Sequence, residues 1–473
     1  MKKILLGFQI LILSAVPLFS ETEMMINEFY GGSINMNFSV NSDALYGSRG
    51  DALRNGGTVS TLDRRQSISS YNPAGLAFLR GGFAVISGNP VRIGLDSDMV
   101  ETFAGESLTD IVNEALEDAF SDFIFAPGVS PEVQSINAFI GQGSGIMGLE
   151  AVVPFAGNRM AVGIAREEKL SIDFNLLMNG METLINVYDT DDPTLDAAAR
   201  IKGSVSALLD VKNIVTTAAF GARITDNIGV GIAVERYEST LKLNAYADPD
   251  GSIDFMGNTY EFNTSASNSL YQEAVGGYSA DGWGFKLGAA FQTEDRVFEA
   301  GFDAVIGPKL SYAGGIDVNY HTFPETLNPG DITLTEAGSY DELNRQININ
   351  IPSYIRISLS WNPGVIMALN YVRYLEPFSF DFEDGLMELE MTDSIRLGLN
   401  FDVFQLGFGV IFSSEKFDFT DPDTLITENL TENIPIPLLS MGFVVPWTKQ
   451  FETEFVLLAL PMPFAKAAVS YNF

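Results

Sequence analysis

Phe464-Ala-Lys-Ala-Ala-Val-Ser-Tyr-Asn-Phe473, the last ten residues of the chain, is the stretch that predicts its fold. Side chains alternate between the two faces of an extended strand. One face is apolar and the other is polar or small, with Ala467, Val469, Tyr471 and Phe473 on the first and Lys466, Ala468, Ser470 and Asn472 on the second. This pattern is typical of the closing strand of an outer-membrane barrel, where lipid-facing and lumen-facing residues alternate. An ordinary amphipathic edge strand is the alternative.

The same period-two alternation recurs between residues 81 and 473. Clear examples begin at Ile228, Trp283, Phe298, Ile355 and Leu406. Short turn-like stretches and long polar stretches alternate between these segments, as periplasmic turns and outer loops do in membrane barrels. We therefore predict an all-β fold, a transmembrane antiparallel β-barrel of about fourteen strands over residues 81–473. About twelve or sixteen strands would also fit the pattern.

The N-terminus has the features of a secretory leader. Lys2 and Lys3 precede an apolar run from Ile4 to Phe19, and the small Ser20 is followed by polar sequence. We predict a signal peptide over residues 1–20. A membrane anchor is the alternative, but the run is short for a helical span of about 20 residues. The barrel would then lie in a bacterial outer membrane.

Composition excludes several classes of protein. The formal net charge is −34, so nucleic acid is a poor partner, because phosphate binding needs clustered Lys and Arg. There are no cysteines, which excludes disulfides and thiolate metal sites. Apolar residues make up 46% of the chain, too many for a disordered protein. We expect neither a cofactor nor a metal.

Two long loops carry helical signals. In the first, Leu108, Ile111, Val112, Leu116 and Phe120 form one apolar stripe at helical spacing, with Ser107 as a candidate N-cap. In the second, residues 195–209 are rich in Ala and Leu. The stripe either packs against its own loop or forms an apolar surface that collects a hydrophobic ligand at the mouth of the barrel.

A turn motif lies just before the barrel, at Asn72, Pro73, Ala74, Gly75 and Leu76. Asn-Pro initiates a turn, proline fixes φ, and glycine permits a left-handed step. This stretch resembles the FadL family of outer-membrane transporters for long-chain fatty acids and other hydrophobic molecules. In that family an N-terminal hatch with an Asn-Pro-Ala motif plugs a fourteen-stranded barrel. The resemblance implies a hatch, or plug, over residues 21–80.

The resemblance also implies a function. A FadL-like barrel would passively transport hydrophobic small molecules, long-chain fatty acids first among them, and release them sideways through a gap at a kinked third strand. The third predicted strand runs from about Met160 to Phe174, and its alternation is disturbed by the charge cluster Arg166-Glu-Glu-Lys169, so a lateral opening would lie near Gly163, Arg166 and Glu167. This charge cluster either lies above the bilayer or marks a lateral opening there. Related secretion-associated barrels share the motif, and a general diffusion porin is a further alternative.

Several charged residues fall on the predicted lumen face. They are Lys286, Glu299, Asp303, Arg356 and Arg396. Buried charges need partners, so we expect these side chains to pair with the hatch rather than to line an open polar path. Catalysis is not expected, because His321 is the only histidine and lies in a predicted outer loop.

The C-terminal strand resembles the assembly signal of outer-membrane barrels, with Tyr471 and Phe473 in its aromatic places. The resemblance implies that the barrel assembly machinery binds this strand. The other expected partners are a fatty-acid-like small molecule and outer-membrane lipid.

Overall fold

The computed structural model describes most of the chain. The described residues are 22–42, 72–89, 93–105, 107–121, 123–142, 145–189, 196–255, 257–262, 272–322, 336–340, 347–382, 385–401, 403–420, 427–460 and 464–473. The predicted signal peptide, residues 1–20, lies outside them and stays a prediction. Residues 43–71 of the predicted hatch also lie outside them.

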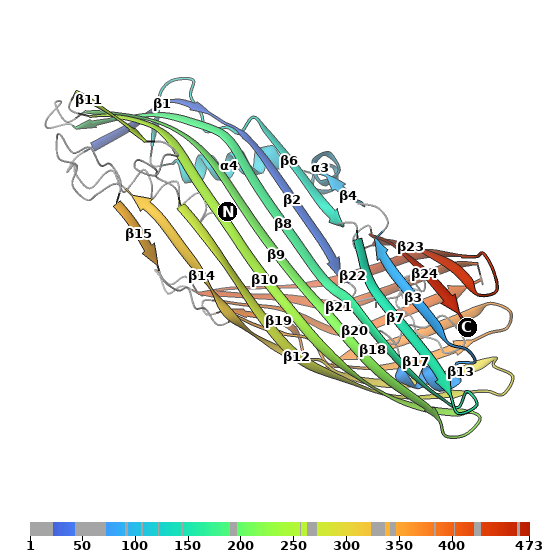
Figure 1. Cartoon of the computed structure of the whole chain (residues 1–473). Coiled ribbons are helices and arrows are strands. Elements are labelled where there is room, and N and C mark those ends of the chain that lie inside the picture. Colours follow the sequence, from blue (N-terminus) through green and yellow to red (C-terminus); the bar gives the residue numbers. More distant parts are fainter. Residues whose placement is uncertain are drawn as a thin grey trace.

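Within the described residues, fourteen antiparallel strands close into one barrel (Figure 1). In chain order they are β3 (Phe83–Asn89), β7 (Gly145–Phe155), β8 (Met160–Asp189), β9 (Ala197–Arg223), β10 (Ile228–Phe255), β12 (Gln272–Gln292), β13 with β14 (Phe298–Ile306, Lys309–Thr322), β16 with β17 (Ile347–Asn350, Tyr354–Trp361), β18 with β19 (Ile366–Tyr374, Phe378–Phe382), β20 (Gly385–Asn400), β21 (Phe404–Thr420), β22 (Thr427–Pro446), β23 (Phe451–Leu460) and β24 (Phe464–Asn472). The predicted all-β barrel is confirmed.

The C-terminal strand closes the barrel as its alternation predicts. β24 pairs with β23 on one side and with β3 on the other, and the backbones of Gly82 and Phe473 exchange two hydrogen bonds of 2.9 Å. Lys466 and Ser470 are buried on the inner face, whereas Tyr471 is 45% and Phe473 56% exposed on the outer face. The strand therefore has the two-faced character that a lipid boundary requires.

The outer surface carries an apolar belt near the short turns. On β10, for example, Ile228, Val230 and Ile232 are exposed, and Trp283, Phe285 and Leu287 are exposed beside them on β12. The belt ends at an ion-paired group in which Arg166 contacts Glu238 at 3.0 Å and Arg236 contacts Asp281 at 3.2 Å. From Ile228 to Arg236 the strand is about 26 Å long at roughly 3.3 Å per residue, which at the usual strand tilt of about 35–45° covers about 20 Å of a belt about 25 Å tall.

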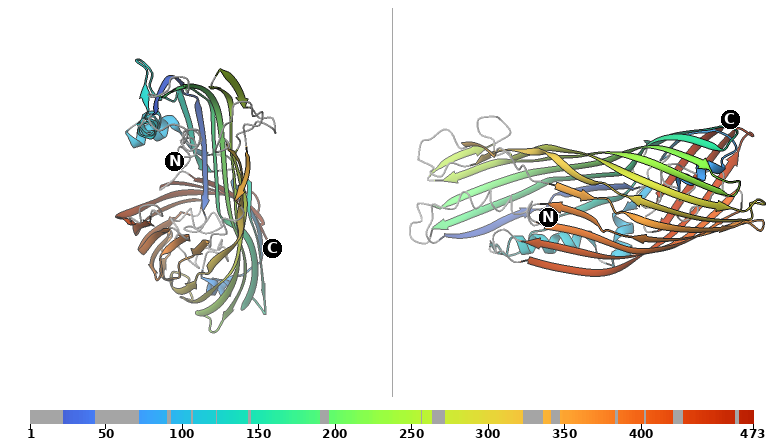
Figure 2. Two further views of the ribbon diagram at one scale, coloured as in Figure 1. Left: turned by 90° about the vertical axis from the view of Figure 1, so that its left-hand side faces the viewer. Right: turned by 90° about the horizontal axis from the view of Figure 1, so that it is seen from below.

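Strands β8, β9 and β10 continue far beyond this belt. They contain 30, 27 and 28 residues, whereas a membrane span needs about 9–11. Two N-terminal strands, β1 (Thr22–Tyr30) and β2 (Ser33–Ser42), pair antiparallel with the far part of β8. Outside them lie β5 (Ile124–Phe125), β6 (Ser135–Gln142) and β4 (Ile93–Asp96). We call this projecting sheet the extension; Figure 2 shows it standing away from the barrel.

Two helices pack on the extension, α3 (Ser97–Ala104) and α4 (Leu108–Ala119). Ser107 caps α4 as predicted, since its hydroxyl accepts a hydrogen bond of 3.2 Å from the Thr109 amide. Val112, Leu116 and Phe120 are buried in one core with Ile26 and Ile185 of the sheet. The inner side of the apolar stripe thus packs on the sheet of the extension, and a role of the stripe in ligand collection stays a prediction. The smaller strands β11 (Asn258–Phe262) and β15 (Glu336–Tyr340) pair at the outer ends of β10 and β14.

The structure corrects one expectation and refines another. The described part of the predicted helical stretch, residues 196–209, is not helical, because β9 begins at Ala197 and pairs with β8 and β10 along its length. The division at residue 80 stays a prediction, but residues 22–42 within the predicted hatch form β1 and β2 of the extension. Among the described residues, no helix is both long enough and apolar enough to span a membrane.

The barrel lumen as candidate functional site

The Asn-Pro-Ala-Gly motif forms a short 3₁₀ helix, η1 (Pro73–Phe78), on the inner side of the barrel wall. Asn72 caps it, because its Oδ1 accepts a hydrogen bond of 2.9 Å from the Ala74 amide. Its Nδ2 donates to the carbonyl oxygens of Ala289 on β12 and Phe302 on β13, at 2.9 and 3.0 Å. One asparagine side chain thus stabilises the turn and attaches it to two strands of the wall.

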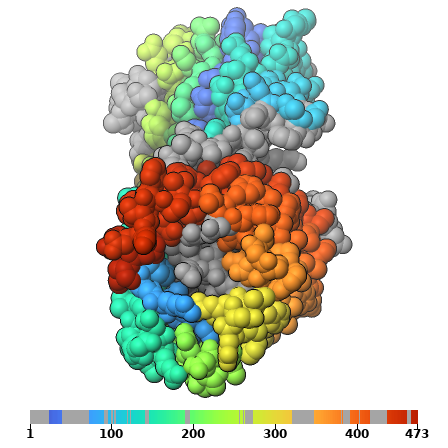
Figure 3. Space-filling view, turned by 90° about the vertical axis from the view of Figure 1, so that its right-hand side faces the viewer, coloured from blue at the N-terminus to red at the C-terminus, as the bar shows by residue number. Residues whose placement is uncertain are grey.

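The wall leaves space for η1 through glycines on adjacent strands. Gly221 on β9, Gly231 on β10 and Gly288 on β12 lie in one paired row. A Cβ atom at Gly221 would lie 2.6 Å from the Leu76 Cβ, and one at Gly231 or Gly288 would collide with Pro73 or Asn72. Only glycine permits this close approach of two backbones. Figure 3 views the barrel from the end with the short turns, where the blue region around η1 and β3 faces the opening.

A charged cluster lies directly beyond η1, centred on the fully buried Glu235 of β10. Its Oε1 contacts the Nζ atoms of Lys286 on β12 and Lys169 on β8, at 2.9 and 3.0 Å. Its Oε2 accepts a hydrogen bond of 3.0 Å from the Tyr237 hydroxyl. Two ammonium groups and a hydroxyl therefore compensate one carboxylate that water does not reach.

A bulge in β8 brings Lys169 into this cluster. Pairing with β9 jumps from Glu168 to Leu170, so Lys169 is the extra residue. A bulge changes which residues face inward, because the alternation shifts at the extra residue. Glu167 lies on the inner face before the bulge, and Ile172 and Leu176 lie on it afterwards. The disturbed alternation in the sequence is thus the signature of this bulge.

The residues of the predicted lateral opening lie in a paired stretch of wall. Gly163 pairs with Val152 of β7 and Ala219 of β9, and Glu167 pairs on both sides as well. Arg166 points outward, toward Glu238. Pairing with β7 ends at Glu167, and pairing with β2 begins at Leu170. Glu168 and Lys169 therefore lie at a seam between the barrel wall and the extension, and a lateral opening stays a prediction.

A second buried ion pair joins β13 and β17. Arg356 donates two hydrogen bonds to Asp303, at 2.9 and 2.8 Å. Arg396 on β20 donates to the Ser394 hydroxyl at 3.0 Å and to the Tyr374 hydroxyl at 3.2 Å. The side chain of Glu299 is also buried. These described partners of Lys286, Arg356 and Arg396 all belong to the wall; pairing with the hatch residues 43–71 stays a prediction.

Beyond the charged residues, the inner wall becomes apolar and aromatic. One cluster includes Tyr237, Leu241, Leu310, Tyr312 and Ile349, and another includes Val372, Tyr374, Ile411, Leu438 and Leu458. Phe378 packs against both clusters. The lumen of a water-filled barrel is polar, whereas this part of the described inner wall is apolar.

Sequence reasoning missed Lys169, Glu235 and the tyrosines of this wall. Glu235 and Tyr237 are on the inner face of the strand that begins at Ile228, whose alternation the sequence showed. Extension of that alternation by two steps would have found them. Lys169 belonged to the disturbed stretch of the sequence, but the pattern could not show which residue the bulge turns inward.

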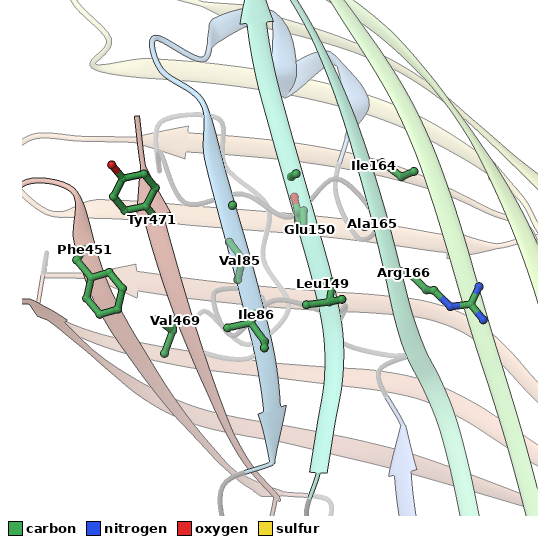
Figure 4. Close-up of a pocket in the computed structure, with 12 residues that line it drawn as sticks. Val85, Ile86, Leu149, Glu150, Ile164, Ala165, Arg166, Phe451, Val469 and Tyr471 are labelled. Atoms are coloured by element: carbon green, nitrogen blue, oxygen red, sulfur yellow. The ribbon is translucent and has the colours of Figure 1, made fainter.

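One well-defined groove lies on the outside of the barrel. It has a volume of about 540 Å³ and runs across β23, β24, β3, β7 and β8 (Figure 4). Ile86, Leu149, Val469 and Tyr471 line it with small alanines between them. All four point outward within the apolar belt, so membrane lipid rather than the lumen adjoins this groove.

Fold, belt and lumen together define the class: the chain is a transmembrane β-barrel of the outer-membrane type, with its motif turn held inside the wall. Its fold is similar to that of a FadL homologue from Pseudomonas aeruginosa, at 13% identity and a TM-score of 0.44, covering 90% of this chain and 98% of that one. It is also similar to the toluene transporter TbuX of Ralstonia pickettii, at 12% identity and a TM-score of 0.41, covering 90% and 98%. The toluene transporter TodX of P. putida matches at 11% identity and a TM-score of 0.38, covering 89% and 97%.

No protein-family model matches the chain. No curated protein matches it either.

Proposed function

We propose that this barrel is a passive outer-membrane channel for hydrophobic small molecules, with long-chain fatty acids as the first candidates. The observation that carries the proposal is the apolar inner wall beyond the charged cluster. Transfer of apolar surface from water to such a wall is favourable by about 25 cal/mol per Å². No nucleotide or other energy source enters this mechanism.

The hatch is the second part of the proposal. In it, residues 21–80 regulate passage, and η1 is the end of the hatch that stays attached to β12 and β13 through Asn72. In this proposal cargo leaves sideways through a gap near Gly163, Arg166 and Glu167, because the seam at Glu168 and Lys169 lies beyond the end of the lipid belt. Of the α4 residues proposed to collect ligand, Ile111 is the most exposed, at 41%. Outer-membrane lipid would surround the belt, and the assembly machinery would bind the C-terminal strand.

Uptake by cells tests the transport itself. Cells that lack their own uptake of hydrophobic compounds should take up labelled long-chain fatty acid and labelled toluene faster when they express the protein. No acceleration for either compound would overturn the proposal. Acceleration for toluene alone would retain the channel and reject fatty acids as its cargo.

Conductance in planar bilayers tests the plug. The wild-type protein should be nearly silent, whereas Gly231→Val should open steady channels, because the new side chain collides with Pro73 and displaces η1. Gly277→Val is the matched control, since a Cβ there lies 3.6 Å from its nearest neighbour, the Leu241 carbonyl oxygen. Large steady channels in the wild type would instead identify a general diffusion porin.

A further inference from the structure

Four tyrosines occupy neighbouring inward positions just beyond the charged residues. They are Tyr237 on β10, Tyr312 on β14, Tyr354 on β17 and Tyr374 on β18. Tyr237 lies one inward step from Glu235, and Tyr354 lies one inward step from Arg356. The four rings therefore mark the boundary between the charged part of the lumen and its apolar part.

Three of the four rings are held through their hydroxyl groups by a polar neighbour. The Tyr237 hydroxyl is bonded to Glu235, and the hydroxyls of Tyr312 and Ser239 are 2.5 Å apart. The Tyr374 hydroxyl accepts from Arg396. A tyrosine fixed by its hydroxyl keeps one ring position while presenting an apolar face.

The rings are also fixed against one another and against the wall. Tyr354 and Tyr374 meet edge to face with centroids 5.9 Å apart, and the Arg356 guanidinium lies 5.8 Å from the Tyr354 centroid. The Lys169 ammonium lies 5.6 Å from the centroid of Tyr237. A Cβ at Gly284 would lie 3.1 Å from the Tyr237 Cε2, so the glycine leaves room for this ring along the wall.

We infer that these four tyrosines, which we call the tyrosine collar, determine which cargo passes. The inference rests on the proposed function. Leucine or methionine side chains change rotamer to fit cargo of many shapes, whereas anchored rings keep a fixed outline. The collar therefore selects narrow apolar molecules, such as one aromatic ring or an unbranched chain, and rejects wide, fused-ring ones.

Uptake of aromatic hydrocarbons with one, two and four fused rings tests the collar. Tyr312→Ala and Tyr374→Ala should each raise four-ring uptake relative to one-ring uptake by about tenfold, the scale of discrimination by pocket size. Tyr312→Phe keeps the ring and should retain the wild-type preference within about twofold, a small part of that scale. Tyr246→Ala is the matched control, because this exposed tyrosine bonds Asp248 on the outer face of β10.

The outcomes separate the collar from the channel. Heat-modifiable migration on gels selects the variants that remain folded barrels. If one-ring uptake persists in both folded alanine variants with unchanged size preference, the collar is overturned and transport is retained. If the wild-type protein takes up none of the three hydrocarbons and no fatty acid, the proposed function itself fails.

Discussion

Strand β10 passes through two environments, and its alternation has opposite polarity in each. Near the short turns Ile232 points outward and is 51% exposed, while Glu235 points inward and is fully buried. Beyond the belt Lys242 points outward and Leu241 points inward. The lower half is apolar outside with a charged lumen, and the upper half is polar outside with an apolar inner face.

The inversion shows that a period of two fixes only which residues share a face. Which face is apolar depends on the medium outside the sheet: lipid around the belt and water around the extension. The change occurs at Arg236, where the belt ends and ion pairs begin. A strand with one polarity throughout would leave either its lipid face charged or its water face apolar.

The largest expected effect concerns the charged lumen of the lower half. Glu235→Ala removes the only carboxylate that contacts both Lys169 and Lys286 among the described residues. Loss of one partner from a buried ion pair costs about 3–5 kcal/mol. We expect a loss of this size in the free energy of unfolding, measured by urea titration in lipid vesicles.

Removal of one of the opposing charges should reverse part of this loss. Glu235→Ala combined with Lys169→Met should be more stable than Glu235→Ala alone, because one uncompensated ammonium remains instead of two. If the free energy of unfolding of Glu235→Ala alone lies within about 1 kcal/mol of wild type, the range expected for a surface ion pair, the buried cluster is contradicted.

A charge placed on the outer face tests the inversion directly. Ile232→Lys puts an ammonium in the lipid belt and should cost about 2–4 kcal/mol, the cost of a lysine at the membrane midplane. Asn244→Lys lies on the same face of the same strand, in the extension, and should change the unfolding free energy by less than about 0.5 kcal/mol. Equal effects would mean that the belt does not end at Arg236.

The sequence predicted the parts of the fold that depend on local pattern. Alternation gave the strand segments and the closing strand, and Asn72-Pro73 gave the tight turn. The glycine row that receives this turn was not predictable, because Gly221, Gly231 and Gly288 lie on three strands and meet only through their register.

The wrong expectation and the missed features also depend on pairing between residues that are far apart in the sequence. Residues 195–209 favour a helix by composition, but hydrogen bonding to β8 and β10 outweighs propensity. β1 and β2 have partners more than a hundred residues away on β8. Lys169 is 66 residues from Glu235, and only the bulge places it on the inner face.

The smallest effect is expected for an ion pair of the extension. Arg200 on β9 contacts Glu182 on β8 at 3.1 Å and Glu28 on β1 at 3.7 Å, and its side chain is 56% exposed. Water and salt screen such a pair, so Arg200→Ala should cost only about 0–1 kcal/mol, measured in the same urea titration. The loss should shrink further at high salt, whereas the loss for Glu235→Ala should persist, because water does not reach the buried cluster. An Arg200→Ala effect as large as that of Glu235→Ala would mean that the outer face of the extension is covered rather than solvated.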